Sequence, residues 1–217
     1  MTKKTQQYLY DMGIDIFWFK PKPFLITKLN NDNLLKIEKN IEGCKKCSLH
    51  ESRTNIVFGD GDSKADIMII GEAPGQEEDK IGQPFIGRAG KLLNSFLSSI
   101  NLDRDSVFIT NTVKCRPPDN RNPENIEIQS CSNFLDRQID VIKPKVLVLL
   151  GKIAANRMLD LDKPISELRL KKFYIGKYNM PLIVFYHPAY ILRSPSQKLK
   201  VWDDLKFLKS IISANGC

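Results

Sequence analysis

The sequence lacks any apolar run of the roughly 18 residues that a membrane-spanning helix needs. Met1-Thr2-Lys3-Lys4 is not followed by the apolar segment of a secretory signal peptide, and Asp11 and Asp15 argue against an amphipathic import sequence. The chain has no internal repeat, no low-complexity tract, and neither a G-x-G-x-x-G nor a P-loop motif. These absences argue against membrane, secreted and repeat proteins, and we expect the protein to act in the cytoplasm.

Positive charge is in excess, with 33 Lys and Arg residues against 25 Asp and Glu residues and a formal net charge of +8. Such a balance favours a polyanionic partner such as nucleic acid, although a basic protein without one has the same composition. The length of 217 residues suits one domain. Aromatic residues followed by Lys20-Pro21-Lys22-Pro23 predict an N-terminal extension over residues 1–30, and residues 31–217 would form the domain.

Short apolar runs alternate with segments of helical spacing from residue 66 onward. The predicted strands are 66–70, 107–110, 146–150 and 182–186, and the predicted helices are 31–42, 88–100, 122–142, 152–159 and 197–213. The continuous apolar run at 146–150 requires cover on both faces, as in a parallel sheet. The alternation predicts an α/β fold, a three-layer α/β/α sandwich with a mainly parallel four-stranded central sheet.

Two of the helices allow more detailed predictions. Asn122, Pro123 and Glu124 are typical of a helix start, with a capping side chain, a proline at the first position and an acid near the positive dipole end. The spacing of that helix turns Cys131 inward. In the last helix we expect one apolar stripe to face the core, formed by Leu199, Trp202, Leu205, Leu208 and Ile212.

The spacing of four cysteines suggests a single metal site to which distant parts of the chain contribute ligands. Cys44 and Cys47 form a C-x-x-C pair, and Cys115 and Cys131 follow much later. Four thiolates suit either a structural zinc ion or a [4Fe–4S] cluster, and a zinc site could also recruit His50. Unrelated reduced thiols are an alternative, whereas disulfides fit poorly because a chain of this length buries a core without them.

Polar residues and glycines follow three of the four predicted strands. The first strand leads into Gly71-Glu72-Ala73-Pro74-Gly75, the second into Asn111-Thr112 and the fourth into His187-Pro188. Ligands of open α/β sheets bind beyond the carboxyl ends of the strands, so we expect these segments to meet at one site. Each segment alone would also suit a turn or a capped strand end.

Taken together, these motifs resemble those of the uracil-DNA glycosylase superfamily, and in particular its iron–sulfur family 4. The similarity runs from about Cys44 to Ser194 and covers GEAPGQEEDKIGQPFIGRAGKLL at 71–93, FITNTVKCRPPDNRNP at 108–123 and HPAYILR at 187–193. The resemblance implies a DNA repair enzyme that hydrolyses uracil from single- or double-stranded DNA and leaves an abasic site. It also implies a [4Fe–4S] cluster held by the four cysteines, Cys44, Cys47, Cys115 and Cys131.

The partner implied by the resemblance is uracil-containing DNA in the nucleoid, bound by a monomer. The extension over residues 1–30 lies outside the similarity and could pack on the core or bind a replication or repair protein. The main competing interpretation is a non-catalytic iron–sulfur protein that binds DNA with the same fold. A relative that traps its product through a histidine in an inserted loop fits less well, because the loop after Arg88 has neither feature.

Carried over onto this sequence, the family motifs assign the uracil pocket to Gly71, Ala73, Phe85, Asn111 and Glu78. Phe85 would stack on the flipped base. The amide of Asn111 can donate to O4 and accept from N3–H, a pattern that cytosine reverses. Glu78 would fill the space that a thymine methyl group needs.

Glu72 and His187 are the expected catalytic residues. A neutral His187 that donates to uracil O2 would stabilise the charge that develops on the leaving base. Glu72 would position the water or offset the positive charge of the oxocarbenium-like sugar. Family 1 enzymes carry an aspartate one residue later, where Ala73 stands here, so the identity of the water-activating group stays open.

The resemblance and the positive charge together suggest a DNA-contacting set, formed by Arg88, Lys114, Arg116, Arg121, Ile191, Leu192 and Arg193. Ile191 or Leu192 could wedge into the gap that the flipped base leaves. The basic side chains would bind phosphates, although each one alone is equally consistent with a solvated charge.

Overall fold

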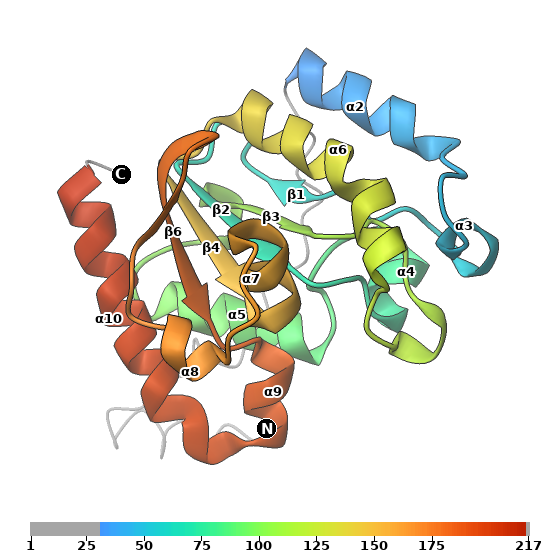
Figure 1. The fold of residues 1–217 in the computed structure, drawn as a ribbon. Helices are drawn as coiled ribbons and strands as arrows, with labels where there is room; N and C mark the ends of the chain where they lie inside the picture. Colours follow the sequence, from blue (N-terminus) through green and yellow to red (C-terminus); the bar gives the residue numbers. More distant parts are fainter. Residues whose placement is uncertain (1–30, 216–217) are drawn as a thin grey trace, which may run out of the picture.

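The computed structural model describes residues 31–215, so the predicted N-terminal extension lies outside the described residues. The centre of the described domain is a sheet with the strand order β1-β3-β2-β4-β6-β5 (Figure 1). The strands are β1 (Asp60–Gly61), β2 (Ile67–Gly71), β3 (Phe108–Asn111), β4 (Val146–Leu150), β5 (Phe173–Ile175) and β6 (Tyr178–Phe185). The four inner strands run parallel, and β1 and β5 pair antiparallel at the two edges.

The α/β class is therefore confirmed, but the prediction of four strands is wrong because the sheet has six. The four predicted strands are the four parallel ones. The two additional strands have only two and three residues, which is too short to show a period in the sequence.

All five predicted helices are present, with ends that differ by a few residues. The helices are α2 (Asp32–Glu42), α3 (Leu49–Ser52), α4 (Gln76–Ile81), α5 (Arg88–Ser98), α6 (Asn125–Ile142), α7 (Gly151–Leu159), α8 (Ile165–Leu168), α9 (Pro188–Arg193) and α10 (Lys198–Asn215). The sequence did not predict α3, α4, α8 and α9, each of which has four to six residues. Within residues 31–215, none of the helices combines the length and the apolar character needed to cross a bilayer.

Helices pack against both faces of the sheet (Figure 1). Met68 and Ile70 of β2 join a buried cluster with side chains of α2, α6 and α7, whereas Ile67 and Ile69 join a second cluster with side chains of α5 and α10. Successive strand side chains point to opposite faces, so an all-apolar strand needs cover on both sides. The result is a sheet layer between two helical layers.

Helix α6 begins later than its sequence predicts. Glu124 is the N-cap, and the buried carboxylate of Glu127 accepts a hydrogen bond from the Glu124 backbone N–H at 2.7 Å. The predicted start at Asn122 and Pro123 is therefore wrong, because this capping box satisfies the first N–H groups two residues further on. The inward orientation of Cys131 is confirmed, since its side chain is buried.

Helix α10 is turned relative to the prediction. Leu205 and Leu208 are buried as expected, but Leu199 is 79% exposed and Trp202 is 46% exposed. The buried stripe is instead formed by Val201, Leu205, Leu208 and Ile211. Both stripes have helical spacing, so periodicity alone could not decide which of them packs on the sheet.

Candidate active site

The topology places a binding site at the carboxyl end of β2. This strand lies between β3 on one side and β4 on the other, so the chain changes direction across the sheet at β2. Such a switch point leaves a crevice beyond the strand ends. The register pairs Gly71 of β2 directly with Asn111 of β3, and Thr112 continues the ladder by donating its backbone N–H to the Gly71 carbonyl at 2.9 Å.

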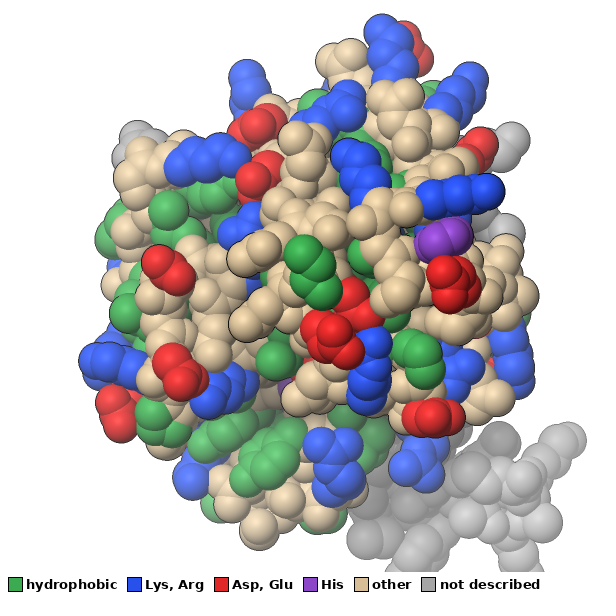
Figure 2. Space-filling view, turned by 45° about the vertical axis from the view of Figure 1, so that its right-hand side comes forward, with side chains coloured by type: hydrophobic (Ala, Val, Ile, Leu, Met, Phe, Trp, Pro, Cys, Tyr) green, Lys and Arg blue, Asp and Glu red, His purple; other side chains and the backbone are tan. Residues whose placement is uncertain are grey.

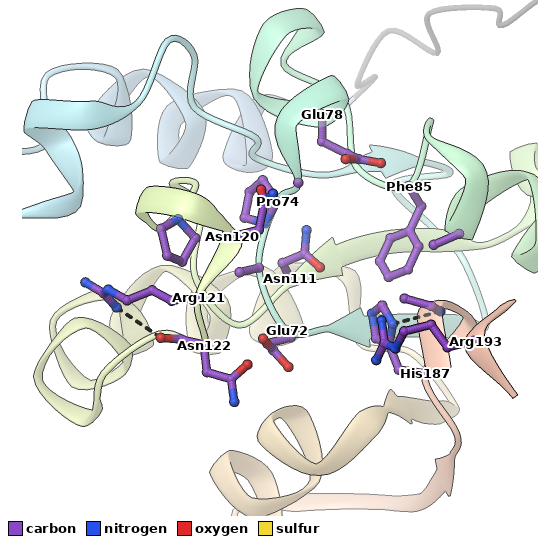
Figure 3. Close-up of a pocket in the computed structure, with 15 residues that line it drawn as sticks. Glu72, Pro74, Glu78, Phe85, Asn111, Asn120, Arg121, Asn122, His187 and Arg193 are labelled. Atoms are coloured by element: carbon purple, nitrogen blue, oxygen red, sulfur yellow. Dashed lines mark hydrogen bonds between the residues drawn. The ribbon is translucent and has the colours of Figure 1, made fainter. Parts of the chain in front are cut away.

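A cleft of about 410 Å³ lies at this point. The predicted residues that line it are Glu72, Ala73, Glu78, Phe85, Asn111, Arg121, His187 and Arg193. Figure 3 shows Glu72, Asn111, Phe85 and His187 around one space, although they come from three separate strand ends and a loop. The predicted convergence of Glu72, Asn111 and His187 on one ligand site is therefore consistent with the structure. Asn120 and Asn122 also line the cleft and were not predicted.

Asn111 is the most distinctive side chain of the cleft. It is buried, and its Oδ1 atom accepts no hydrogen bond from any residue in the described part of the chain. A buried amide oxygen without a partner is expensive, so its presence in a cleft points to a ligand that donates a hydrogen bond. A Cβ at Gly71 would lie 2.5 Å from this Oδ1 and 2.6 Å from the Phe85 ring, so glycine is needed there to leave room for both.

The orientation of His187 is set by the start of α9. His187 is the N-cap of this helix, and the backbone N–H of Ala189 donates to its Nδ1 at 3.2 Å. The proton of the neutral ring is therefore on Nε2. Burial lowers the pKa of His187 to about 4, with a further contribution from the positive charge of Arg193. At physiological pH the ring is neutral and can donate one hydrogen bond.

The lowered pKa predicts that His187 makes the protein less stable in acid. The unfolded chain binds a proton at this imidazole below about pH 6.5, whereas the folded chain does so only near pH 4. The free energy of unfolding therefore falls as the pH drops through this window. Between about pH 7.5 and about pH 5, we expect His187 to account for about 2 kcal/mol of the loss. Urea unfolding of the wild type and of His187→Gln measures it, and an equal loss in both proteins would contradict the assignment.

Glu72 follows β2 and lines the same cleft. Burial raises the pKa of its carboxyl group, and the positive charge of Arg193 lowers it in part. Figure 3 shows the carboxylate on the same side of the cleft as His187. A partly buried carboxylate of raised pKa is a better proton acceptor than a solvated one.

Phe85 and Glu78 form the opposite wall of the cleft (Figure 3). The Phe85 ring is buried, and its centroid lies 5.7 Å from that of His187 with a tilt of 35°. Glu78 accepts hydrogen bonds at Oε1 from the backbone N–H groups of Ile86 at 3.0 Å and Gly87 at 2.9 Å. Its carboxylate therefore holds the loop that carries Phe85, besides facing the cleft.

The predicted DNA contacts have different surroundings. Arg88, Leu192 and Arg193 are exposed, and Leu192 is 38% exposed on α9. Arg116 donates from Nε to Asn120 Oδ1 at 2.8 Å, and Arg121 donates to both carboxylate oxygens of Glu127, at 2.6 and 2.9 Å. Lys and Arg side chains are spread over the face in Figure 2, with Asp and Glu side chains among them, so charge alone does not outline a path for DNA.

Two of the predicted DNA contacts are wrong. Lys114 is fully buried, and its ammonium group donates to Gln138 Oε1 at 2.6 Å and to the Asn111 carbonyl at 2.8 Å. Burial lowers its pKa to about 7. The ammonium group thus supports the end of β3 instead of binding a phosphate. Ile191 is also fully buried, in the cluster shared with α5 and α10, which leaves Leu192 as the candidate wedge.

The four predicted metal ligands come together at a separate place. Cys44, Cys47, Cys115 and Cys131 are free thiols and line one small cavity, together with His50 and Arg53. Among residues 31–215, however, no three His, Cys, Asp or Glu side chains are arranged so that they could hold a metal ion.

The two later cysteines are buried and lie next to positive groups. Burial raises the pKa of Cys131 to about 11 and raises that of Cys115, while Lys114 and Arg53 oppose these shifts. Arg53 donates from Nη1 to the Cys115 sulfur at 3.1 Å, a contact that the sequence did not predict.

Residues 58–206 match the family model described as the uracil DNA glycosylase superfamily. The chain is 48% identical over 188 residues to the type-4 uracil-DNA glycosylase of Sulfurisphaera tokodaii. This alignment covers 83% of this chain and 85% of the relative. It is 42% identical over 181 residues to the protein of the same name from Archaeoglobus fulgidus, with coverage of 81% and 91%. For that from Thermotoga maritima, the identity is 40% over 186 residues, with coverage of 83% and 95%.

Proposed function

Because the chain belongs to the uracil DNA glycosylase superfamily, we propose that it is a DNA repair enzyme that removes uracil from DNA. It hydrolyses the bond between uracil N1 and deoxyribose C1′ in single- or double-stranded DNA and leaves an abasic site. The observation that carries this proposal is the unpaired, buried Oδ1 of Asn111 in a cleft shared with Glu72 and His187. Uracil has the N3–H donor that this oxygen lacks.

The base is recognised outside the helix, because its glycosidic bond cannot be reached within the stack. Asn111 accepts from uracil N3–H and donates its amide group to O4. Cytosine presents an acceptor at N3 and a donor at its amino group. Its acceptor would therefore face the Asn111 oxygen, and its donor would face the Asn111 amide N–H group. Phe85 stacks on the flipped ring, Gly71 and Ala73 leave room for it, and Glu78 stands where a thymine methyl group would have to fit.

The main catalytic contribution is stabilisation of the leaving base. As the bond breaks, negative charge builds up on the uracil, and the Nε2–H group of His187 donates to O2. The donor is already oriented by Ala189 and already neutral, so it needs no reorganisation during the reaction. Glu72 either accepts a proton from the attacking water or offsets the positive charge of the sugar.

Exposed residues at the rim hold the DNA strand. Leu192 wedges into the gap left by the base, and Arg193 beside it binds a phosphate, as does Arg88 at the start of α5. Arg116 and Arg121 lie on the segment between Cys115 and α6, where their side chains are oriented by Asn120 and Glu127. Arg116 is the stronger candidate phosphate ligand, because both Nη atoms of Arg121 are already paired with the Glu127 carboxylate.

The four cysteines supply the all-thiolate ligand set that a [4Fe–4S] cluster takes, and a structural zinc ion is the alternative. Four thiolates on one zinc ion stand about 3.8 Å apart, given Zn–S bonds of about 2.3 Å. A cluster takes each thiolate at a different iron corner, so its ligands stand farther apart. The four thiols line one cavity, and the similarity to type-4 uracil-DNA glycosylases favours the cluster. The cluster would tie the C-x-x-C turn to α6 and to the segment after Cys115, which is a structural role.

We expect the purified protein to contain about four iron and about four sulfide per chain. Cys131→Ser should lose most of the visible absorption of the cluster and should unfold at a lower temperature than the wild type. The matched control is Cys217→Ser, which changes the fifth cysteine of the sequence, outside the predicted ligand set, and should retain both iron and stability. A colourless wild-type protein that carries zinc would contradict the cluster assignment.

The proposed activity is tested by incubating the wild-type protein with an oligonucleotide that contains one uracil and then treating the product with alkali. Cleavage at the uracil position is expected, because abasic sites break in alkali. The same sequence with cytosine or thymine should stay intact. DNA binding without cleavage would favour the competing interpretation, a non-catalytic DNA-binding protein.

A further inference from the structure

Phe85 has a backbone conformation that an aromatic residue rarely adopts. Its φ of 52° lies in the left-handed region, which β-carbon sterics disfavour for bulky side chains. Strained conformations persist only where the surrounding structure holds them, and they cluster at functional sites. The residues that hold Phe85 are therefore candidates for a role in the reaction, even if they lie outside the cleft.

The backbone around Phe85 is held from two sides. On one side, Glu78 accepts from the N–H groups of Ile86 and Gly87. On the other, Arg104 donates from Nη2 to the Pro84 carbonyl at 2.7 Å and from Nη1 to the Phe85 carbonyl at 3.3 Å. The guanidinium group of Arg104 thus binds the carbonyl oxygens of Pro84 and Phe85. The carboxylate of Glu78 binds the N–H groups of the next two residues.

Arg104 is itself fixed by Asp60. Nε and Nη2 of Arg104 both donate to Asp60 Oδ2, at 3.1 and 2.9 Å. The side chains are only 11% and 4% exposed. Asp60 lies on the edge strand β1, which pairs with β3 opposite Ile109, and Arg104 opens the short 3-10 turn η2 (Arg104–Ser106) just before β3. The ion pair therefore links the edge of the sheet to the Phe85 loop.

A role in stability alone does not explain this arrangement well. A buried ion pair often contributes little net stability, because both charges lose their hydration. The planar guanidinium group, in contrast, suits the simultaneous binding of one carboxylate and two carbonyl groups, which a lysine cannot reproduce. These contacts are suited to fixing the position of the loop that carries Phe85.

We propose that Arg104, held by Asp60, is a positioning residue that places the Phe85 ring where it can stack on the flipped uracil. This inference rests on the proposed function of the cleft. Arg104 is not among the residues that line the cleft, so its proposed action is through the backbone of Pro84 and Phe85, whose carbonyl groups it binds. A displacement of about 1 Å at a substrate-positioning group can lower a rate by about 10²-fold.

The test is a double-mutant cycle with Arg104→Ala and Phe85→Ala, read as the rate of uracil release with enzyme in excess over DNA. Arg104→Ala should lower this rate by about 10-fold to 10²-fold in the wild-type background. In the Phe85→Ala background, the same change should alter the rate by less than about two-fold, because the ring it positions is gone. Equal effects in both backgrounds would overturn the inference, and so would an unchanged rate in Arg104→Ala.

Two further variants and one control separate positioning from loss of stability. Arg104→Lys and Asp60→Asn keep most of the side-chain volume, and each should also slow uracil release. Arg157→Ala removes an arginine from an ion pair with Asp136, on the α6–α7 side of the molecule. It should leave the rate unchanged below its unfolding temperature. If the rates of Arg104→Ala, Arg104→Lys, Asp60→Asn and Arg157→Ala all fall in proportion to their loss of stability, the positioning role is overturned.

A crystal structure of Arg104→Lys gives a readout that does not depend on activity. The inference expects Phe85 to leave the left-handed region or its ring to shift in the cleft. If Phe85 keeps its position, the positioning role is wrong, whatever the rate. A wild-type protein that releases no uracil would instead refute the proposed function itself.

Discussion

His187→Ala is expected to lower the rate of uracil release by about 10²- to 10³-fold, which is the effect of removing one preorganised donor from a developing anion. The wild-type ring is neutral, with its proton placed on Nε2 by the hydrogen bond from Ala189. Alanine leaves the charge on uracil O2 without a donor. The measurement is the rate of uracil release with enzyme in excess, together with the dissociation constant for the same DNA.

The comparison with His187→Gln makes this prediction sharper. Glutamine retains an N–H donor of similar reach, so it should recover part of the rate that alanine loses. Binding of DNA should change little in either variant, because the histidine stabilises the transition state more than the bound substrate. A rate equal to that of the wild type in His187→Ala would reject the role of this residue.

Asn111→Asp is expected to reduce the preference for uracil over cytosine and to lower the rate on uracil by about 10²-fold. The carboxylate has no donor for uracil O4, and its second oxygen faces that carbonyl. The amino group of cytosine, in contrast, can donate to the new carboxylate. Rates of base release from matched uracil and cytosine oligonucleotides give the ratio directly.

The structure offers a matched control for this substitution. Asn94 on α5 also has a buried Oδ1 that accepts no hydrogen bond from the described residues, but it is not among the residues that line the cleft. Asn94→Asp should therefore leave the ratio of uracil to cytosine unchanged. If the ratio in Asn111→Asp also stays at the wild-type value, Asn111 does not read the base.

Much of the fold could be predicted because its main elements have a local signal. The run at 146–150 became β4, and the helical spacing at 88–100 became α5 with the first and last turns within two residues. The edge strands could not be predicted, since Asp60–Gly61 becomes a strand only through its pairing with β3. The start of α6 was misplaced because the capping box of Glu124 and Glu127 competes with the start signal of Asn122 and Pro123 a few residues earlier.

Much of the candidate site could also be predicted, because its residues follow strands whose carboxyl ends meet by topology. Glu72, Asn111 and His187 needed only the strand order to converge. The DNA-contacting set was less predictable. Lys114 and Arg116 are two residues apart and both have basic side chains, yet Lys114 is fully buried and Arg116 contacts Asn120 at the surface.

The sequence by itself determined the four parallel strands and the five longer helices, the four thiols that line one cavity and the polar residues that follow the strands. These properties depend on the spacing of residues along the chain, which can be read directly from the sequence. Only the tertiary structure decided that Lys114 supports β3, that α10 packs through Val201, and that Arg104 holds the turn at Phe85. Burial and hydrogen bonding at those positions depend on partners that only the folded chain brings within reach.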